Sequence, residues 1–311
     1  MRFIDAATID AVLSFPVLVD ALHAAHRRPR MEVQDTLLGH EAAAYFVRSA
    51  NDPGRFMASK LVTSFPGNPG RSTLPSVQGV VVLFDGTDGR PLVALDGTAL
   101  TAWRTAADSA LGVRLLAPPA PATLLVVGAG QMSRWLVRAH RSVRPSLGRV
   151  LIWNRDRSRA EAVAADLRAE GTPAEAVTDL RAATRDADLI STCTGSLVPL
   201  VQGADLKPGA HLDLVGSYRN DMREADDEAM RRARVYVDLR ASGRDVGELQ
   251  IPLANGSLRE ADILGDHYEL VAGTAAGRLS DRDITLVKNA GGGHLDLMTA
   301  ECILGLVGSD V

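Results

Sequence analysis

Thr123-Leu-Leu-Val-Val-Gly-Ala-Gly-Gln-Met-Ser133 is the stretch of sequence that decides the fold. It runs from an apolar strand-like segment through Gly128, Ala129, Gly130, Gln131 and Met132 into a helix-like segment that begins at Arg134. In a dinucleotide-binding turn, the first glycine permits the tight bend and the second lets a pyrophosphate approach the backbone. A third small residue, here Ser133, lets the helix pack closely against its strand. Since a second strand-like run follows at 149–153, the pattern predicts a nucleotide-binding unit whose helix N-terminus faces the phosphates.

The end of that second strand, Asn154-Arg-Asp-Arg-Ser-Arg159, indicates which dinucleotide is bound. A protein that binds NAD usually carries an acidic residue there for the ribose hydroxyls. Asn154 is neutral, and Arg155, Arg157 and Arg159 offer charge and forked donors to a 2′-phosphate. The segment therefore favours NADP(H) over NAD(H), with Arg155 as the main phosphate ligand. The alternative is that these arginines form the solvated first turn of a helix that begins near Ser158, partly neutralised by Asp156.

A proline-rich segment, Leu115-Leu-Ala-Pro-Pro-Ala-Pro121, predicts a domain boundary because consecutive prolines end a helix and stiffen the chain. Residues 118–284 alternate strands and helices, which predicts a Rossmann-type doubly wound parallel sheet. A glycine-rich turn at 291–293 leads into a helix that we expect to return to the first domain. The predicted architecture is α/β, with a second, α+β domain formed by residues 1–117 and 285–311. Its predicted elements are helices at 5–26 and 98–116 and strands at 43–48, 57–64, 78–84 and 91–95.

Composition excludes several classes of protein. The chain has 311 residues, 46% of them hydrophobic and 23% charged, as expected of a globular protein with room for two domains. Its net charge of −4 argues against a nucleic-acid partner, and no apolar run approaches the ~20 residues that span a bilayer. We therefore expect a cytoplasmic protein with no membrane partner. The two cysteines, Cys193 and Cys302, do not form a disulfide framework, and the scattered histidines predict no metal site.

Two cations of the first domain occupy unusual positions. Strand alternation places Lys60 on the same face as Ala58 and Val62, where a buried ammonium needs an anion or a cleft. The alternative is an ordinary lysine on a solvated face. Arg104 flanks the apolar stripe of the predicted 98–116 helix. It either forms an i,i+4 pair with Asp108 or clamps a substrate carboxylate.

Motifs along almost the whole chain resemble those of the ornithine cyclodeaminase/mu-crystallin family, which includes ketimine reductases and archaeal-type alanine dehydrogenases. The resemblance implies that Lys60 and Arg104 hold the substrate carboxylate beside the nicotinamide, with help from Arg30 or, as the alternative, Arg28. It also implies a homodimer joined through the first domains, whose sheets together form one barrel. The matching motifs are Lys60-Leu-Val-Thr63, Asp96-Gly-Thr98, Arg104-Thr-Ala-Ala107, Val127-Gly-Ala-Gly130, Trp153-Asn-Arg155, Ala187-Asp-Leu-Ile190, Thr192-Cys-Thr-Gly195, Val215-Gly-Ser-Tyr-Arg219, Val235-Tyr-Val-Asp238 and Gly247-Glu-Leu249.

Further cofactor residues are expected where nucleotide-domain strands end, because ligands bind there in this topology. We expect Cys193 and Thr194 to line the nicotinamide ribose. The other candidates at these strand ends are Thr192, Val215, Gly216 and Ser217.

One departure from the family pattern distinguishes between its activities. Cyclodeaminating members carry an aspartate where this chain has Tyr218, and a phenol is a far weaker base than a carboxylate. Ornithine cyclodeamination is therefore disfavoured, unless Asp213 or Asp221 takes that role. The sequence is most similar to the Δ1-pyrroline-2-carboxylate (cyclic ketimine) reductase branch.

The resemblance implies NADPH-dependent reduction of a small cyclic imino acid to L-proline or L-pipecolate. Lys60, Tyr218 and a bound water are the candidates for keeping the imine nitrogen protonated. His294 is either a further proton donor or a packing residue. The alternatives are a cyclodeaminase or amino-acid dehydrogenase of the same family, and a non-catalytic binding protein regulated by NADP(H).

Overall fold

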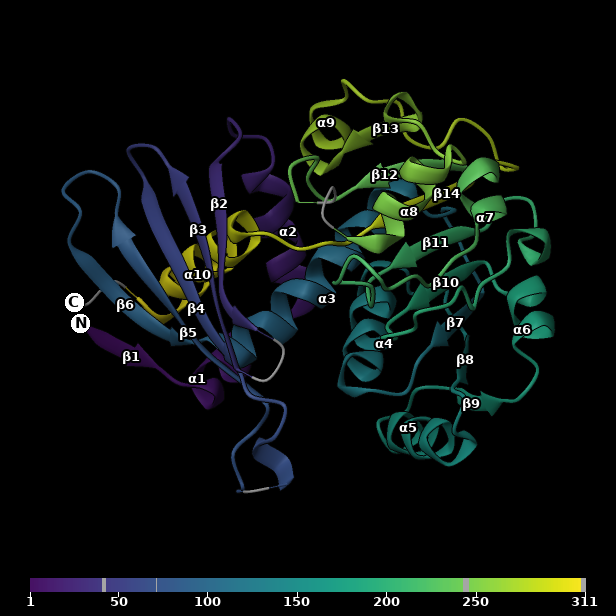
Figure 1. The fold of residues 1–311 in the computed structure, drawn as a ribbon, viewed down its shortest axis with the longest axis horizontal. Helices are drawn as coiled ribbons and strands as arrows, with labels where there is room; N and C mark the ends of the chain where they lie inside the picture. The colour runs from purple at the N-terminus through teal and green to yellow at the C-terminus, as the bar shows by residue number, and fades with distance from the viewer. Residues whose placement is uncertain (41–42, 71, 243–245, 309–311) are drawn as a thin grey trace. The chain divides into compact units, whose positions relative to one another are not determined.

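The computed structural model describes residues 1–40, 43–70, 72–242 and 246–308. The chain divides into two compact units (Figure 1). The first contains Met1–Ala107 and the chain from Gly292 onward, and the second contains Asp108–Gly291.

Both predicted limits of the nucleotide-binding unit need correction. The first limit lies inside helix α3 (Gly97–Leu116), ten residues before the predicted 117/118 boundary, because the second half of α3 packs in the core of the second unit through Val113 and Leu116. The return to the first unit occurs at Gly292 and not at 285. Strand β14 (Ile284–Lys288) pairs in parallel with two strands of the second sheet and therefore belongs to that unit.

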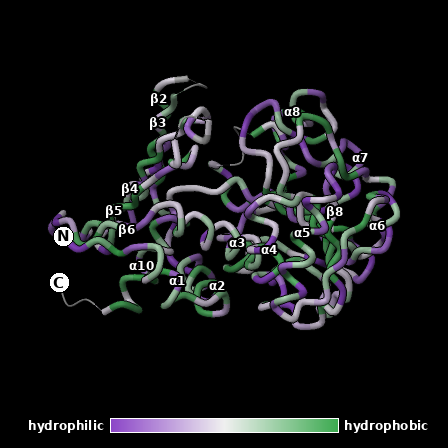
Figure 2. The backbone as a smooth tube through the Cα atoms, turned by 90° about the horizontal axis from the view of Figure 1, so that it is seen from below, coloured by the Kyte–Doolittle hydropathy of each residue, from purple (hydrophilic) through white to green (hydrophobic). Residues whose placement is uncertain are grey.

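The first unit is a six-stranded sheet in the order β1-β6-β5-β4-β3-β2, in which all neighbours are antiparallel except β1 and β6. Helix α10 (Gly293–Val307) packs against β2 to β5 and against helix α2, and Figure 2 shows that much of α2 and α10 is hydrophobic. The strands are β1 (Arg2–Ile4), β2 (Glu32–His40), β3 (Ala43–Asp52), β4 (Phe56–Ser64), β5 (Val77–Asp85) and β6 (Pro91–Asp96).

The N-terminal region differs from its prediction in two ways. The helix expected over 5–26 is two helices, α1 (Ala6–Val12) and α2 (Phe15–Ala25), because Leu13 and Ser14 take extended backbone angles. Pro16, at the start of α2, suits a helix N-terminus and not a helix interior. The nine-residue strand β2 was not predicted, because its mixed polar sequence has no clear strand pattern. Hydrogen bonds to β3 stabilise it as a strand.

The second unit is an eight-stranded sheet in the order β13-β12-β14-β11-β10-β7-β8-β9, and all of its strand pairs are parallel. This confirms the predicted Rossmann-type doubly wound sheet. The strand order reverses between β7 and β10, and ligands bind at such switch points. The strands are β7 (Thr123–Val127), β8 (Arg149–Trp153), β9 (Ala174–Val177), β10 (Leu189–Thr192), β11 (His211–Leu214), β12 (Ala233–Val237), β13 (Ile263–Asp266) and β14.

Helices connect these strands and cover the sheet. Two apolar clusters, one containing Leu125 and Val127 and the other Leu124 and Val126, show that β7 is buried on both faces. The helices are α4 (Gln131–Val143), α5 (Arg157–Ala169), α6 (Leu180–Asp186), α7 (Asp227–Arg232), α8 (Gly247–Asn255) and α9 (His267–Ala272).

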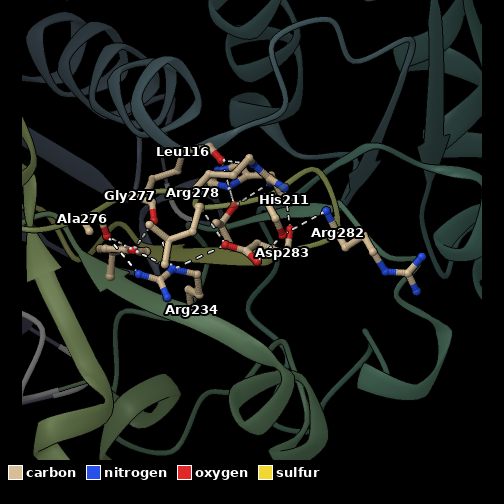
Figure 3. A network of polar contacts seen from close by, with 12 residues as sticks. Leu116, His211, Arg234, Ala276, Gly277, Arg278, Arg282 and Asp283 are labelled. Carbon is tan, nitrogen blue, oxygen red and sulfur yellow. Dashed lines mark hydrogen bonds and ion pairs between the residues drawn. The ribbon is translucent and has the colours of Figure 1, made fainter.

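A polar network fixes the segment that leads into β14 (Figure 3). The Arg278 guanidinium donates to the Leu116 carbonyl at 3.0 Å and to the Thr285 hydroxyl at 3.0 Å, and Arg234 donates to the Gly277 carbonyl at 3.1 Å. Burial lowers the pKa of His211 to about 3, so its ring stays neutral beside Thr285. The network holds β14 in place at the centre of one half of the sheet.

No single helix in the described residues is both long and apolar enough to cross a membrane. Helices α1 and α2, which bend by 87° from one another, satisfy the length and composition test only as a pair.

Candidate active site

The carboxyl edge of the parallel sheet collects the cofactor residues that the sequence predicted. Gly128 to Met132 follow β7, Asn154 to Arg159 follow β8, Thr192 ends β10 just before Cys193 and Thr194, and Val215 to Ser217 follow β11. Because all of these strands run in parallel, their carboxyl ends lie along one edge of the sheet. Residues from four separate motifs therefore meet at one place in the second unit.

The turn after β7 has the backbone that a dinucleotide turn requires. Gly128 has a φ of 121°, and a Cβ there would lie 2.9 Å from the Cys193 carbonyl oxygen, so only glycine fits. Gly130 is the N-cap of α4, no side chain caps that end of the helix within the described residues, and a Cβ at Gly130 would meet no atom of the chain within 4 Å. The open amides of α4 and the space beside Gly130 fit a pyrophosphate.

The segment after β8 agrees in part with each interpretation of its sequence, the 2′-phosphate site and the solvated first turn of a helix. Asp156 caps α5, Arg159 lies 3.7 Å from Asp156, and Arg157 lies 3.3 Å from Glu161, as in an ordinary solvated first turn. Arg155 differs from them, because it is exposed and makes no hydrogen bond or ion pair with the described part of the chain. Its guanidinium is thus available to a phosphate.

A carboxylate that sequence reasoning missed holds two of these strand ends together. Glu224 accepts hydrogen bonds from the Thr194 amide at 2.7 Å and hydroxyl at 2.8 Å, and from the amides of Gly216 at 2.7 Å and Ser217 at 3.3 Å. Glu248 in turn accepts from the amides of Glu224 and Ala225. Burial raises the pKa of Glu248 to about 7, and neighbouring Glu224 adds to the rise. The motif Gly247-Glu-Leu249 was the only sequence signal of this arrangement.

Thr192 and Cys193 lie at the switch point of the sheet. The Thr192 hydroxyl is buried and has no hydrogen-bond partner in the described residues, so a bound group has a donor to use there. Burial raises the pKa of the Cys193 thiol far above neutrality, which leaves it protonated and unreactive. These two positions fit a ligand-lining role and not a redox role.

The acids near Tyr218 are engaged in other contacts. Asp213 is fully buried, accepts from the hydroxyls of Ser109 at 2.9 Å and Ser191 at 2.6 Å, and lies 3.2 Å from the His140 ring. Asp221 is exposed and paired with Arg219. Tyr218 itself is 70% exposed in the segment after β11. Asp213 is thus engaged inside the second unit, and Asp221 is held in a surface ion pair.

The first unit brings Lys60 and Arg104 together around a buried carboxylate. Lys60 Nζ lies 2.8 Å from Asp296 Oδ1, and Arg104 Nε lies 3.3 Å from the same oxygen. Lys60 and Arg104 are 3% and 7% exposed, so Lys60 is not an ordinary surface lysine. Asp108, the alternative partner of Arg104, is instead bonded to His267. Sequence reasoning missed Asp296, whose signal was one acid within the apolar helix after the glycine-rich turn.

A further arginine, Arg48, adjoins this pair. The sheet register sets Arg48 of β3 directly opposite Lys60 of β4, and Asp35 of β2 directly opposite Arg48. Arg48 Nε lies 3.0 Å from Asp35 Oδ2. Like charges on directly opposed residues destabilise a sheet unless an anion lies between them. The cluster therefore holds three cations, Lys60, Arg104 and Arg48, against two carboxylates, Asp296 and Asp35.

The other residues expected at the substrate, Arg30, Arg28 and His294, also belong to the first unit. Arg30 is exposed in the segment between α2 and β2. Arg28 is bonded through both of its terminal nitrogens to Glu301, at 2.9 and 2.8 Å. His294 is fully buried in the first turn of α10, edge-on to the His26 ring with 5.9 Å between ring centroids, which favours its packing role.

A sequence profile of the ornithine cyclodeaminase/mu-crystallin family matches residues 28–307. The chain belongs to this family. It is 40% identical over 303 residues, 97% of this chain and 96% of the relative, to a Δ1-pyrroline-2-carboxylate reductase from Paracoccus denitrificans. These matches confirm the resemblance drawn from the motifs.

Solved structures of family relatives have the same fold over nearly the whole chain. The Thermococcus litoralis Δ1-pyrroline-2-carboxylate reductase, in complex with NADH and L-proline, has a TM-score of 0.92 at 26% identity and covers 99% of this chain and 97% of its own. The iminosuccinate reductase of Paracoccus denitrificans, in complex with NAD⁺, has a TM-score of 0.89 at 30% identity, with 99% and 96% covered.

Family motifs outside the two sites have local structural reasons. Asp96 accepts from the amides of Thr98 at 2.9 Å and Ala99 at 2.8 Å, which starts the helix that carries Arg104. A Cβ at Gly97 would lie 2.7 Å from the backbone of Gly79, so glycine is needed where α3 leaves the sheet. This motif therefore fixes the start of the helix that positions Arg104.

Proposed function

We propose that this chain reduces a small cyclic imino acid, such as Δ1-pyrroline-2-carboxylate, to the corresponding L-amino acid with NADPH. The chain is an oxidoreductase that acts on C=N bonds with a nicotinamide cofactor. The observation that carries the substrate class is the meeting of two buried cations, Lys60 and Arg104, in the first unit, with the half-buried Arg48 directly opposite Lys60. Buried cations are costly, so two of them at one place beside a third cation support a desolvated anionic ligand.

Lys60 and Arg104 anchor the carboxylate of the imino acid in this proposal. Hydrogen bonds between charged groups contribute about 1.5–3 kcal/mol each, and they fix the position of the ring that carries the C=N bond. Arg48 assists them in this proposal, because it lies directly opposite Lys60 in the sheet. Arg30, the assisting residue that the family resemblance implies, stays the alternative.

The reduced nicotinamide, when bound, supplies the hydride for the C=N carbon. The chain's own task is then to keep the ring nitrogen protonated. Lys60 suits this task, since burial lowers its pKa to about 8 and leaves it charged but able to give up a proton near neutral pH. Tyr218 and a bound water remain the alternatives.

NADPH is proposed over NADH on the residues of this chain alone. Asn154 places no carboxylate beside the ribose, and Arg155 offers an exposed guanidinium that no other side chain in the described residues occupies. The two structural relatives contain NADH and NAD⁺. The proposed preference of this chain for NADPH therefore rests on Asn154 and Arg155 and not on those relatives.

We also propose a homodimer formed through the first unit. Helix α10 covers one face of the sheet, where Val81 and Leu83 are fully buried. On the other face Val80, Val82 and Phe84 are only partly buried, next to a hollow of about 570 Å³ lined by Met57, Ser59 and Phe84. A second copy of this sheet would cover that face.

The experiment that tests the function follows reduced-nicotinamide absorbance with a panel of substrates. We expect turnover with the five-membered cyclic ketimine, slower or comparable turnover with the six-membered one, and none with pyruvate plus ammonia. L-ornithine should release no ammonia. Ornithine deamination would favour a cyclodeaminase, and tight ligand binding with no change in the cofactor would favour a non-catalytic binding protein.

A further inference from the structure

Asp296 is a buried acid beside the proposed substrate site, and the proposed reaction gives it no role. It lies in the first turn of α10, where the helix N-terminus favours a negative charge, and its side chain is 1% exposed. Burial raises the pKa of this carboxyl, but Lys60, Arg104 and Arg48 outweigh burial and hold the pKa below its ordinary value. Asp296 is therefore ionised at neutral pH.

Lys60 depends on that negative charge. The charged neighbours of its ammonium are Asp296 from α10, Arg104 from α3 and Arg48 from β3, with Asp35 of β2 beyond Arg48, while β5 presents the apolar Val81 opposite Lys60. Burial, Arg104 and Arg48 lower the pKa of Lys60, Asp296 opposes them, and together they bring the pKa to about 8. Without Asp296, burial and the two arginines would favour the neutral amine, and the Thr101 hydroxyl, 3.5 Å from the ammonium, would be a weak acceptor for it.

The contact does not have the form of an optimised structural salt bridge. Lys60 and Arg104 both approach Oδ1 of Asp296, while Oδ2 is buried with no hydrogen-bond partner in the described residues. An unsatisfied buried oxygen costs about 1–3 kcal/mol, and a purely structural bridge would be expected to satisfy both oxygens. The cost is explained if both cations must also face a second carboxylate.

We propose that Asp296 is a positioning residue that keeps Lys60 charged and in place for the carboxylate of the substrate. This rests on the proposed function for the identity of the substrate. The effect on Lys60 itself does not rest on it, because it follows from the contacts within the first unit. The negative charge of Asp296 also repels the substrate carboxylate, which weakens substrate binding at low pH. At higher pH the same charge keeps Lys60 protonated, so that the substrate is still bound.

The direct test measures the titration of Lys60. The chain has only three lysines, Lys60, Lys207 and Lys288, so protein labelled with ¹³C at lysine Cε gives three signals. Lys60→Met assigns the signal of Lys60 by its disappearance. In Asp296→Asn the pKa of Lys60 should fall by about one unit or more, because an opposite charge in contact shifts a pKa by about 1–3 units. Glu301→Gln is the control, since it removes a paired carboxylate from the same helix without touching Lys60.

Kinetics supply a second measurement. The kcat/KM for the cyclic imine should fall as pH rises through the pKa of Lys60, and Asp296→Asn should move this limb to lower pH. Below the limb, KM in the variant should be no higher than in the wild type. Asp296→Glu should restore the wild-type limb. Asp296→Ser, whose smaller side chain admits water, replaces Asp296→Asn if thermal unfolding shows that the amide variant is not folded.

An unchanged Lys60 titration in a folded Asp296→Asn or Asp296→Ser protein would overturn the proposal. If no imine is reduced by the wild type while the Lys60 titration shifts as expected, the proposed function fails and the role of Asp296 stands. If the imine is reduced but neither the titration nor the pH limb shifts, the function stands and the role of Asp296 is refuted.

Discussion

Lys60 is a buried cation and Arg155 an exposed one, and this difference in burial indicates that they bind different anionic groups. Lys60 is 3% exposed and held against Asp296, whereas Arg155 is exposed and unpaired in the described residues. A buried ammonium costs several kcal/mol unless paired, so its retention indicates an anion bound out of water. An exposed guanidinium costs little and adds specificity when a phosphate arrives.

Arg155→Ala should remove much of the preference for NADPH. Loss of one charge-assisted contact of about 1.5–3 kcal/mol lowers NADPH affinity by roughly tenfold or more. The Kd for NADH should stay near the wild-type value, because NADH has no 2′-phosphate. Fluorescence titration with both cofactors measures the two affinities.

Arg157→Ala is the matched control, since Arg157 lies in the same segment but pairs with Glu161. It should leave the ratio of the two affinities nearly unchanged. Full discrimination in Arg155→Ala, or equal use of both cofactors by the wild type, would refute the phosphate site.

Among single residues, the cations of the proposed substrate site could be predicted from the sequence, but the residues that contact them could not. Lys60 stood out because alternation placed a charge on an apolar face, and Arg104 because it flanks an apolar stripe. Asp296 is 236 residues from Lys60, and Arg48 is linked to Lys60 only by strand register, so no local pattern could reveal either contact. The side-chain roles themselves stay predictions.

The turn between β7 and α4 is the element that adapts the second unit to a dinucleotide. Glycine occurs at two of its positions for different reasons. Gly128 is required by its φ of 121° and by the nearby backbone of Cys193, whereas a Cβ at Gly130 would contact no atom of the chain within 4 Å. Steric need for glycine at Gly130 can therefore come only from a ligand.

Gly130→Ala should leave the fold intact but weaken binding of NADPH by about tenfold or more, because the new methyl group occupies the approach of the pyrophosphate. Thermal unfolding and cofactor titration are measured on the same protein. Gly148→Ala is the control in the same unit, since the nearest atom to its added Cβ is 3.8 Å away. Wild-type affinity in Gly130→Ala would place the phosphates elsewhere.

Elements with strong periodicity were predictable, and those fixed by tertiary pairing were not. The alternation of the second unit predicted its parallel sheet, because buried parallel strands are continuous apolar runs. Strand β2 has a mixed sequence that includes Asp35, and only its pairing with β3 makes it a strand. The break at Leu13 and Ser14 was hidden by apolar residues on both sides, although Pro16 marks it.

At the scale of the whole molecule, the two proposed sites belong to different units. The proposed carboxylate site lies in the first unit, the dinucleotide turn lies in the second, and helix α3 contributes residues to both units. The proline-rich segment misled the boundary prediction because it ends α3 and does not end the unit. The tertiary packing of Val113 and Leu116 decides the boundary, and that packing cannot be read from local sequence.

The proposed dimer gives a prediction at this scale. Light scattering should show a mass of about 66 kDa, twice the 33.0 kDa of one chain. Val82→Glu should yield monomers, because it places a charge on the sheet face that the partner covers. Leu279→Glu is the control, since Leu279 is 68% exposed in the second unit. A monomeric wild type, or a dimer that survives Val82→Glu, would contradict the proposed interface.

The central claim is that Lys60 serves the substrate and not the nucleotide, and Lys60→Met tests it most directly. Its kcat/KM for Δ1-pyrroline-2-carboxylate and its Kd for NADPH are measured on the same preparation. Loss of a charged hydrogen bond of about 1.5–3 kcal/mol predicts a fall in kcat/KM of about tenfold to a hundredfold, with the NADPH Kd within about twofold of the wild type. A kcat/KM within about twofold of the wild type, or an equal loss of NADPH affinity, would contradict it.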